Sequence, residues 1–216
     1  MVLLSFATKT ALQNFKRLDA SFYQREDVVQ IGKELLGKVL VSFFDNIKTA
    51  GIVVETEAYR GPDDKACHAY NNKYTERTKV MYENGGLAYV YLCYGIHHLF
   101  NVVTAKKGTA HAVLIRAIEP LDEIETMLKR RKLNRLKTQL TAGPGVMTEA
   151  LGITTASTGM DMTLPESKIW LEDRNIFIDQ KNIIESPRVG VGYAEECALW
   201  NWRFRIAGNK WTSKAE

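Results

Sequence analysis

The chain has 216 residues, of which 45% are apolar and 25% are charged, and its formal net charge is +4. These values are those of an ordinary globular protein that is long enough for a real hydrophobic core. No run of about eighteen apolar residues is present, and no basic segment precedes the short apolar stretch at the start. We therefore expect neither a membrane-spanning helix nor a cleaved secretory leader.

The cysteine pattern bears on compartment and on metal binding. Cys67, Cys93 and Cys197 form no close pair and are odd in number. This pattern favours reduced thiols in a cytosolic compartment over a disulfide frame. The sequence contains no CxxC and no HxxxH spacing, so no metal site is expected.

Positive charge is concentrated in two places. Basic residues crowd into positions 129–137, and Arg203 and Arg205 flank Phe204. Such a run is most often a solvated helix face, which is the interpretation favoured here. A surface that contacts phosphates is the alternative.

The first sixty residues predict one helix and one hairpin. Apolar residues recur at helical spacing over 27–37, between an Asp that can cap the helix and a Gly that can end it. The runs 38–44 and 49–57 predict two paired strands, joined by an Asp-Asn turn at 45–46.

Beyond residue 60, loops alternate with buried strands and helices. Pro62 and the two acids after it can begin a short helix that reaches His68, and 71–84 is predicted to be a loop. Further strands are predicted at 89–94, 99–104, 110–118, 170–171, 176–178, 189–191 and 202–206, and further helices at 121–136 and 146–151. Because strands and helices mix without regular alternation, we predict one α+β domain over 1–216, with the first ~20 residues peripheral.

The stretch 53–101 gathers the residues best suited to chemistry. It contains three of the four histidines, and an acid, Glu57, follows a buried apolar run. A buried carboxylate loses its hydration, so it keeps its charge only where partners hold it. Acids of this kind concentrate in functional sites, although structural acids also occur.

Common catalytic motifs are missing from the sequence. It contains no GxGxxG opening a helix, no GxxxxGK[ST] and no GxSxG. Cys67 and His68 are adjacent, so on a helix they would point roughly 100° apart and could not easily pair as nucleophile and base. Acid–base chemistry by Glu57 in an aromatic pocket is therefore the best candidate.

Several segments, in this order, resemble the alkyladenine (3-methyladenine) DNA glycosylases, and their bacterial members in particular. They are ETEAY, GPDDKACHAY, TERTKVMY, AYVYLCYGIHHLFNVVT, AVLIRAIEP, GPGVMTEALGI, PRVGVGYAEE and WRFRIAGN. The match covers the chain from about 28 to 212. The fold of that family is similar to the C-terminal domain of methionyl-tRNA formyltransferase, so the resemblance implies a curved, mostly antiparallel sheet flanked by helices.

The resemblance also implies a function. The chain would be a monofunctional glycosylase of base-excision repair that flips and hydrolytically excises alkylated or deaminated purines, such as 3-methyladenine, 7-methylguanine, hypoxanthine and ethenoadenine. Its partner would be double-stranded DNA containing damaged purines, and no cofactor, metal or membrane is implied. We expect a monomer in the bacterial cytoplasm, or in the nucleus if the source is eukaryotic.

Particular residues match positions with roles in that family. Glu57 matches the general base that deprotonates a water for attack on C1′. Tyr59, His68 and Tyr91 match the residues that stack on the flipped base. Tyr94 matches the side chain that is wedged into the gap left in the duplex.

Three further matches concern specificity and support. Asn101 matches the residue that limits acceptance of guanine by meeting its 2-amino group. Arg77 and Arg116 match positions that support the site water or contact the DNA backbone. Two other functions stay open: hydrolysis of small N-glycosides such as free nucleosides, and binding of damaged DNA without cutting. The basic run and Tyr94 argue against the first alternative, and Glu57 argues against the second.

Overall fold

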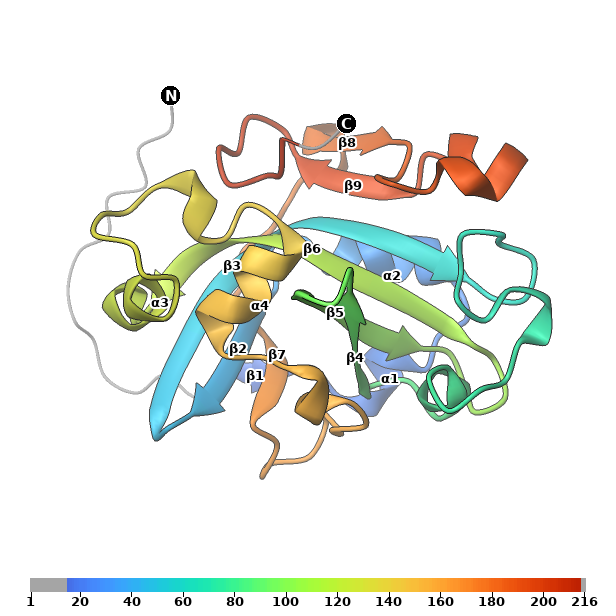
Figure 1. Ribbon diagram of the computed structural model, residues 1–216, viewed down its shortest axis with the longest axis horizontal. Helices are drawn as coiled ribbons and strands as arrows, with labels where there is room; N and C mark the ends of the chain where they lie inside the picture. The colour runs from blue at the N-terminus through green and yellow to red at the C-terminus, as the bar shows by residue number, and fades with distance from the viewer. Residues whose placement is uncertain (1–14, 215–216) are drawn as a thin grey trace.

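Residues 15–214 are described by a computed structural model, in which strands from both ends of the chain join one antiparallel sheet (Figure 1). Seven strands are neighbours in the order β1-β7-β2-β3-β6-β5-β4, and β9 pairs with β3 and β8. Their bounds are β1 (Lys16–Arg17), β2 (Val39–Phe44), β3 (Ile47–Arg60), β4 (Ala88–Cys93), β5 (His97–Thr104), β6 (His111–Asp122), β7 (Ile169–Asp173), β8 (Ile183–Ser186) and β9 (Arg203–Ile206). The predicted α+β class with a mostly antiparallel sheet is confirmed.

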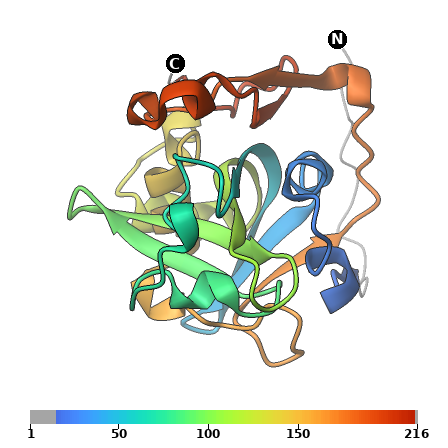
Figure 2. The ribbon, with the colours of Figure 1, turned by 90° about the vertical axis from the view of Figure 1, so that its right-hand side faces the viewer.

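Helices cover both faces of this sheet, with α2 behind β3 and β6 and α4 in front of them (Figures 1 and 2). The helices are α1 (Ala20–Tyr23), α2 (Val28–Glu34), α3 (Ile124–Arg130) and α4 (Pro144–Leu151). Short 3-10 segments are η1 (Tyr70–Asn72), η2 (Lys79–Tyr82), η3 (Thr138–Leu140), η4 (Thr155–Ser157), η5 (Gln180–Asn182) and η6 (Gly192–Leu199). Ile31 of α2 and Met147 of α4 are fully buried in the same apolar cluster as Ile115 of β6. The sheet is thus packed on both sides.

The first helix and the first hairpin form as predicted. Asp27 caps α2 by accepting a hydrogen bond from the Gln30 amide at 2.9 Å. Gly37 follows the helix with a φ of +84°, and a Cβ there would lie 2.6 Å from the Ile176 carbonyl oxygen. Both residues of the turn at 45–46 have positive φ, as a two-residue hairpin loop of type I′ requires.

The helix predicted over 121–136 is wrong in its bounds. β6 continues beyond Pro120, and α3 has only the seven residues Ile124–Arg130. Pro120 is tolerated inside β6 because it lies opposite Gly51 at a register shift, where the ladder is irregular. At the other end, Lys132 has a left-handed φ of +52°, which does not continue a helix.

Three other local predictions are also wrong. The region leading to His68 consists of turns, and neither 176–178 nor 189–191 is a strand. In the segment 189–191, the Val189 amide donates to the side chain of Glu57 and not to a neighbouring strand. Strand β8, which the sequence does not predict, has only four residues, and half of them are exposed.

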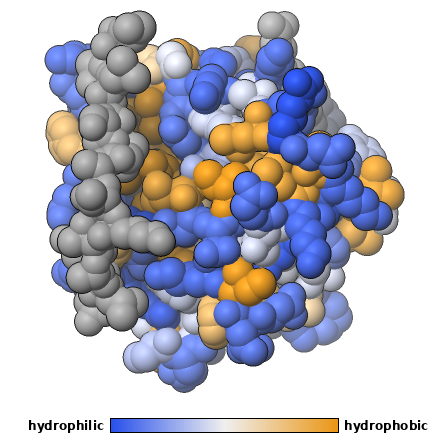
Figure 3. Space-filling view, turned by 90° about the vertical axis from the view of Figure 1, so that its left-hand side faces the viewer, coloured by the Kyte–Doolittle hydropathy of each residue, from blue (hydrophilic) through white to orange (hydrophobic). Residues whose placement is uncertain are grey.

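The sequence predicts that the first ~20 residues are peripheral. Of these, 1–14 lie outside the described residues, and Lys16–Arg17 form the edge strand β1. Figure 3 views the side on which α3 lies in Figure 1, where polar side chains surround a central apolar patch. Within 15–214, no helix is both long enough and apolar enough to cross a membrane. A large cavity lies toward the other end of the sheet, against β4 and β5.

Candidate active site

One row of residues crosses four neighbouring strands and forms the floor of this cavity. Glu57 on β3 pairs with Leu114 on β6, Leu114 with Asn101 on β5, and Asn101 with Tyr89 on β4. Directly paired residues project from the same face of a sheet. The sheet register therefore brings a carboxylate, an amide and a phenol to one surface, and all four residues line the cavity.

The cavity has a volume of about 630 Å³, which lies in the usual range for small-molecule sites. Its walls come from the central strands, the β4–β5 hairpin, the start of α4 and the segment 189–193. All the predicted site residues line it: Glu57, Tyr59, His68, Arg77, Tyr91, Tyr94, Asn101 and Arg116. The structure therefore brings together residues that the sequence spreads over four strands and the loops between them.

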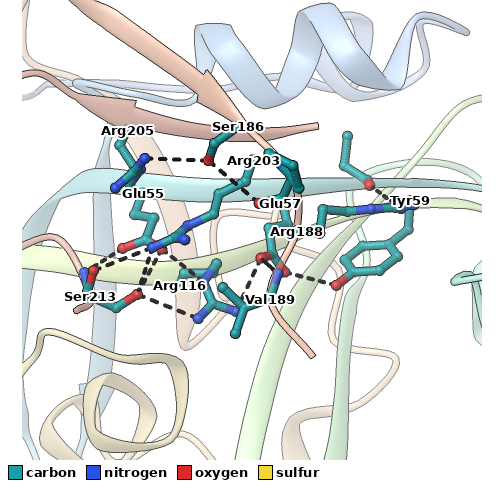
Figure 4. A network of polar contacts seen from close by, with 12 residues as sticks. Glu55, Glu57, Tyr59, Arg116, Ser186, Arg188, Val189, Arg203, Arg205 and Ser213 are labelled. Carbon is teal, nitrogen blue, oxygen red and sulfur yellow. Dashed lines mark hydrogen bonds and ion pairs between the residues drawn. The ribbon is translucent and has the colours of Figure 1, made fainter. Parts of the chain in front are cut away.

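Three donors face the carboxylate of Glu57, which is fully buried (Figure 4). Oε1 accepts a hydrogen bond from the Val189 amide at 2.8 Å and lies 3.3 Å from Nη1 of Arg116. Oε2 accepts a hydrogen bond from the Tyr59 hydroxyl at 2.8 Å. Hydrogen bonds and a nearby guanidinium are the partners that a buried carboxylate needs to keep its charge.

Tyr59 and Arg116 are fixed donors at neutral pH. Burial, reinforced by the neighbouring carboxylate of Glu57, raises the pKa of Tyr59 well above its usual value. Burial lowers the pKa of Arg116, but the charges of Glu57 and Glu55 outweigh burial, so this pKa is raised. Both side chains keep their protons and continue to donate to Glu57.

Val189 is held in place by Arg188, which the sequence analysis missed. The side chain of Arg188 is fully buried and pairs with Asp64, with Nη2 at 2.8 Å from Oδ1. Nη1 donates to the Ala58 carbonyl at 2.9 Å, and the guanidinium carbon lies 4.8 Å from the centre of the Tyr59 ring. A basic residue before Val-Gly-Val-Gly was the available signal, but its acidic partner lies 124 positions away.

His68 is held as one neutral tautomer. Nη2 of Arg77 lies 3.1 Å from Nε2 of His68, and because a guanidinium can only donate, Nε2 is the acceptor. The proton is therefore on Nδ1, which donates to the Tyr89 hydroxyl at 2.8 Å. Burial, followed by the charges of Arg77 and Lys73, lowers the pKa of His68 to about 4. The ring is uncharged at neutral pH.

His68 and Tyr91 form an aromatic wall in the cavity. Their ring centres are 4.6 Å apart and their planes are inclined at 78°. The guanidinium carbon of Arg77 lies 4.8 Å from the centre of the Tyr91 ring, and the Tyr89 ring is 5.6 Å from it. Rings braced in this way can stack on a planar base.

The β4–β5 hairpin ends in an exposed apolar tip. Tyr94 is 91% exposed, and Leu92 and Ile96 beside it are also exposed. Tyr94 has a φ of +51°, a left-handed conformation that is uncommon for a bulky residue. An aromatic side chain that is exposed at the rim of the cavity does not pack a core.

Asn101 presents a fixed amide to the cavity. Its Nδ2 donates to the carbonyls of Tyr89 and Leu99 at 3.0 and 3.3 Å. The residue is buried inside β5, so it is neither a capping nor a turn residue. Two backbone bonds on one nitrogen restrict the side chain to one orientation.

The basic groups noted in the sequence are only partly exposed. Arg203 is buried, and its Nε lies 2.8 Å from Oε1 of Glu55. The alternative that Arg203 contacts phosphates is therefore wrong. Within 129–137, Arg131 pairs with Glu149. The exposed members of that run are Lys129, Lys132, Arg135 and Lys137. For these four, the solvated-face interpretation stays a prediction.

The thiol of Cys67 is unsuited to nucleophilic catalysis. Burial raises its pKa to about 12. Both ring nitrogens of the adjacent His68 are engaged by other side chains, so no Cys–His pair forms. Among residues 15–214, no three His, Cys, Asp or Glu side chains gather closely enough to hold a metal ion.

Comparison with known proteins places the chain in a family. A family model described as methylpurine-DNA glycosylase matches residues 21–210. A Chlamydia felis protein with the provisional name 3-methyladenine DNA glycosylase is 47% identical over 194 residues, which cover 88% of this chain and 95% of the relative. Relatives with the same provisional name from Chlamydia abortus and Bacillus cereus are each 46% identical, covering 88% and 90% of this chain and 97% of each relative. This chain belongs to the methylpurine-DNA glycosylase family.

Proposed function

We propose that this chain is a monofunctional DNA glycosylase that flips damaged purines out of duplex DNA and hydrolyses their bond to deoxyribose. Its substrates are alkylated or deaminated purines of the class of 3-methyladenine, 7-methylguanine, hypoxanthine and ethenoadenine. The observation that carries this proposal is a buried carboxylate, Glu57, held by three donors at the floor of an aromatic cavity. Family membership supports the same chemistry.

Glu57 is the general base of the proposed reaction. A water beside it attacks C1′ of the deoxyribose while one proton of that water passes to the carboxylate. The C1′–N bond breaks, and its electron pair leaves with the purine through an oxocarbenium-like state. The negative charge of Glu57 also stabilises the positive charge that develops on the sugar.

The aromatic wall recognises electron-poor purines. Tyr59, His68 and Tyr91 stack on the flipped base, and a cationic base such as 3-methyladenine gains a cation–π attraction. A neutral His68 suits this substrate, because an imidazolium would repel it. A cationic base leaves without a further proton, whereas a neutral base such as hypoxanthine takes up one as it leaves, supplied by a water or by a side chain of the site.

The hairpin tip and one arginine support the extruded nucleotide. Tyr94 occupies the gap in the duplex and delays return of the base. Arg77 is exposed at the cavity and can contact a backbone phosphate. The site is built from a single chain, and we propose that a monomer acts in the cytoplasm of a bacterial cell.

The test compares wild type with Glu57→Gln and a matched control, Glu125→Gln, in which an exposed acid of α3 is changed. Duplexes that carry each of the four lesions are incubated with each protein, and abasic sites are revealed with alkali. Wild type and Glu125→Gln should cut. Glu57→Gln should bind the lesion duplex without cutting, because the amide keeps the size of the side chain but removes its charge.

Other results would contradict this function. Wild-type-like excision by Glu57→Gln would remove Glu57 from the chemistry, and loss of binding together with cutting would make it a structural acid. Cleavage of free nucleosides but not of duplexes would identify a small N-glycoside hydrolase. Lesion binding by wild type without any cutting would identify a damage-binding protein.

A further inference from the structure

A second buried carboxylate, Glu55, lies two residues before Glu57 on the same face of β3. Its Oε1 is 2.8 Å from Nε of Arg116, from Nε of Arg203 and from the hydroxyl of Ser213 (Figure 4). Its Oε2 accepts a hydrogen bond from the Ser213 amide. Glu55 is fully buried, and the chemistry proposed above does not use it.

Arg116 is shared between the two carboxylates. Its Nε is 2.8 Å from Glu55, whereas its Nη1 is 3.3 Å from Glu57. Charge-assisted hydrogen bonds are normally about 2.7–2.9 Å long, so Arg116 is fully bonded to Glu55 and only loosely to Glu57. Because a guanidinium is planar and rigid, fixing its Nε edge also fixes the position of Nη1. Ser213 adds a contact to Nη2 at 3.4 Å.

The charges in this buried group balance. Glu55 and Glu57 are negative, and Arg116 and Arg203 are positive. Without the charge of Glu55, both arginines would act on Glu57 alone, and Arg116 would be free to close onto it. A carboxylate paired in that way is a weaker base, because a proton would have to displace a guanidinium from it.

We propose that Glu55 is a positioning residue for hydrolysis, which holds Arg116 back from full pairing with Glu57 so that Glu57 can take a proton from water. This inference rests on the proposed function, in which Glu57 is the general base. Glu55 itself does not touch the substrate. Its effect passes through Arg116, and Ser213 helps to hold both in place.

The other groups that face Glu57 are known from the packing around it. Tyr59 lies on the same strand, and Arg188 is on the segment before η6. Arg203 on β9 lies opposite Glu57 in the register of β3 and β9. Tyr91 on β4 is also near Glu57, whose charge is one of the causes that raise the pKa of Tyr91. Of all the charged groups around Glu57, only Arg116 and Arg203 bond to Glu55, so a change at Glu55 acts through these two.

The main test is Glu55→Gln, assayed in single turnover on a hypoxanthine duplex and compared with wild type and Glu57→Gln. We expect the excision rate to fall by about 10- to 100-fold, the range observed when the outer partners of metal ligands are removed. The dissociation constant for the lesion duplex should change less than the rate does. The acid limb of the pH–rate profile should move to lower pH, because a carboxylate that is fully paired with a guanidinium takes up a proton less readily.

A milder variant keeps the proposal testable if Glu55→Gln does not fold. Ser213→Ala leaves all four charges in place and removes only the hydroxyl, which contacts Glu55, Arg116 and Arg203. We expect a smaller loss of rate, with the acid limb displaced in the same direction and the melting temperature close to that of wild type. A displaced acid limb in Ser213→Ala would result from a change in the position of Glu55 and Arg116, because no charge is removed.

Two outcomes would overturn the inference. One is a folded Glu55→Gln or Ser213→Ala protein with a wild-type rate and profile. The other is a slower protein whose acid limb has not moved, because loss of packing alone reduces the amount of active protein without changing its pH dependence. Failure of the proposed function is distinguishable, since Glu57→Gln would then excise as wild type does.

Discussion

The guanidinium of Arg77 donates to Nε2 of His68 at 3.1 Å, and the imidazole in turn donates to Tyr89. The pKa of His68 is lowered from 6.5 to about 4, by burial first and then by Arg77 and Lys73. Between these values the unfolded chain binds a proton that the native state does not. The free energy of unfolding therefore decreases as pH falls through this window, and His68→Gln should remove that part of the decrease.

Urea unfolding at several pH values between about 7 and 4 measures this effect. Arg77→Met removes one cause of the lowered pKa, so it should weaken the pH dependence. Lys79→Met is a matched control, because Lys79 is equally exposed but does not contribute to the pKa of His68. Identical pH dependence in wild type and His68→Gln would contradict the assignment.

Tyr94→Ala should weaken retention of the extruded base and leave stability nearly unchanged, because the side chain is 91% exposed. Tyr94→Gly should be at least as stable as wild type. A glycine adopts the φ of +51° without the cost of about 1–2 kcal/mol that the left-handed conformation carries for other residues. Thermal unfolding and the dissociation rate of a lesion duplex measure the two effects. A stability loss of roughly 3–5 kcal/mol would show that Tyr94 packs a core.

Asn101→Ser should raise the release of guanine relative to hypoxanthine, which differs from guanine by lacking the 2-amino group. The amide of Asn101 is bonded to the carbonyls of Tyr89 and Leu99, so it cannot move aside for that group. A change of about tenfold in the ratio of the two single-turnover rates corresponds to about 1.4 kcal/mol of discrimination. Asn182→Ser, at an exposed asparagine, is the control. An unchanged ratio of guanine to hypoxanthine release would contradict a role of Asn101 in specificity.

Arg188→Met should lower the free energy of unfolding by about 3–5 kcal/mol, because it leaves Asp64 buried without its partner. The matched control is Arg60→Met, whose pair with Asp63 is 40% and 55% exposed. That change should cost less than about 1 kcal/mol. Urea unfolding of both variants measures the two changes in the free energy of unfolding. Equal decreases would mean that burial of the Arg188–Asp64 pair does not determine how much that pair stabilises the fold.

Elements whose signals lie within a few neighbouring residues could be predicted from the sequence. The cap at Asp27, the stop at Gly37 and the Asp-Asn turn at 45–46 are local, and each was found. The passage of β6 through Pro120 was missed because it depends on the irregular pairing with Gly51, far away in the chain. Propensity alone assigned that region to a helix.

The candidate site divides in the same way. The resemblance supplied Glu57 and the aromatic residues, and the sheet register brings Glu57, Asn101 and Tyr89 to one surface. Arg188 and Glu55 were missed, because buried ion pairs are defined by partners on other strands and segments. A burial pattern cannot distinguish an arginine paired in the interior from one in solvent until the fold is known.

The hydrogen bond between Val189 and Glu57 joins residues 132 positions apart, and that between Ser213 and Glu55 spans 158. The β4–β5 hairpin that carries Tyr91, by contrast, closes over a three-residue turn. Contacts between distant residues form after local ones, because closing a long loop costs more chain entropy. We therefore expect a folding chain to form part of its aromatic wall before Glu57, the proposed catalytic base, is held by its partners.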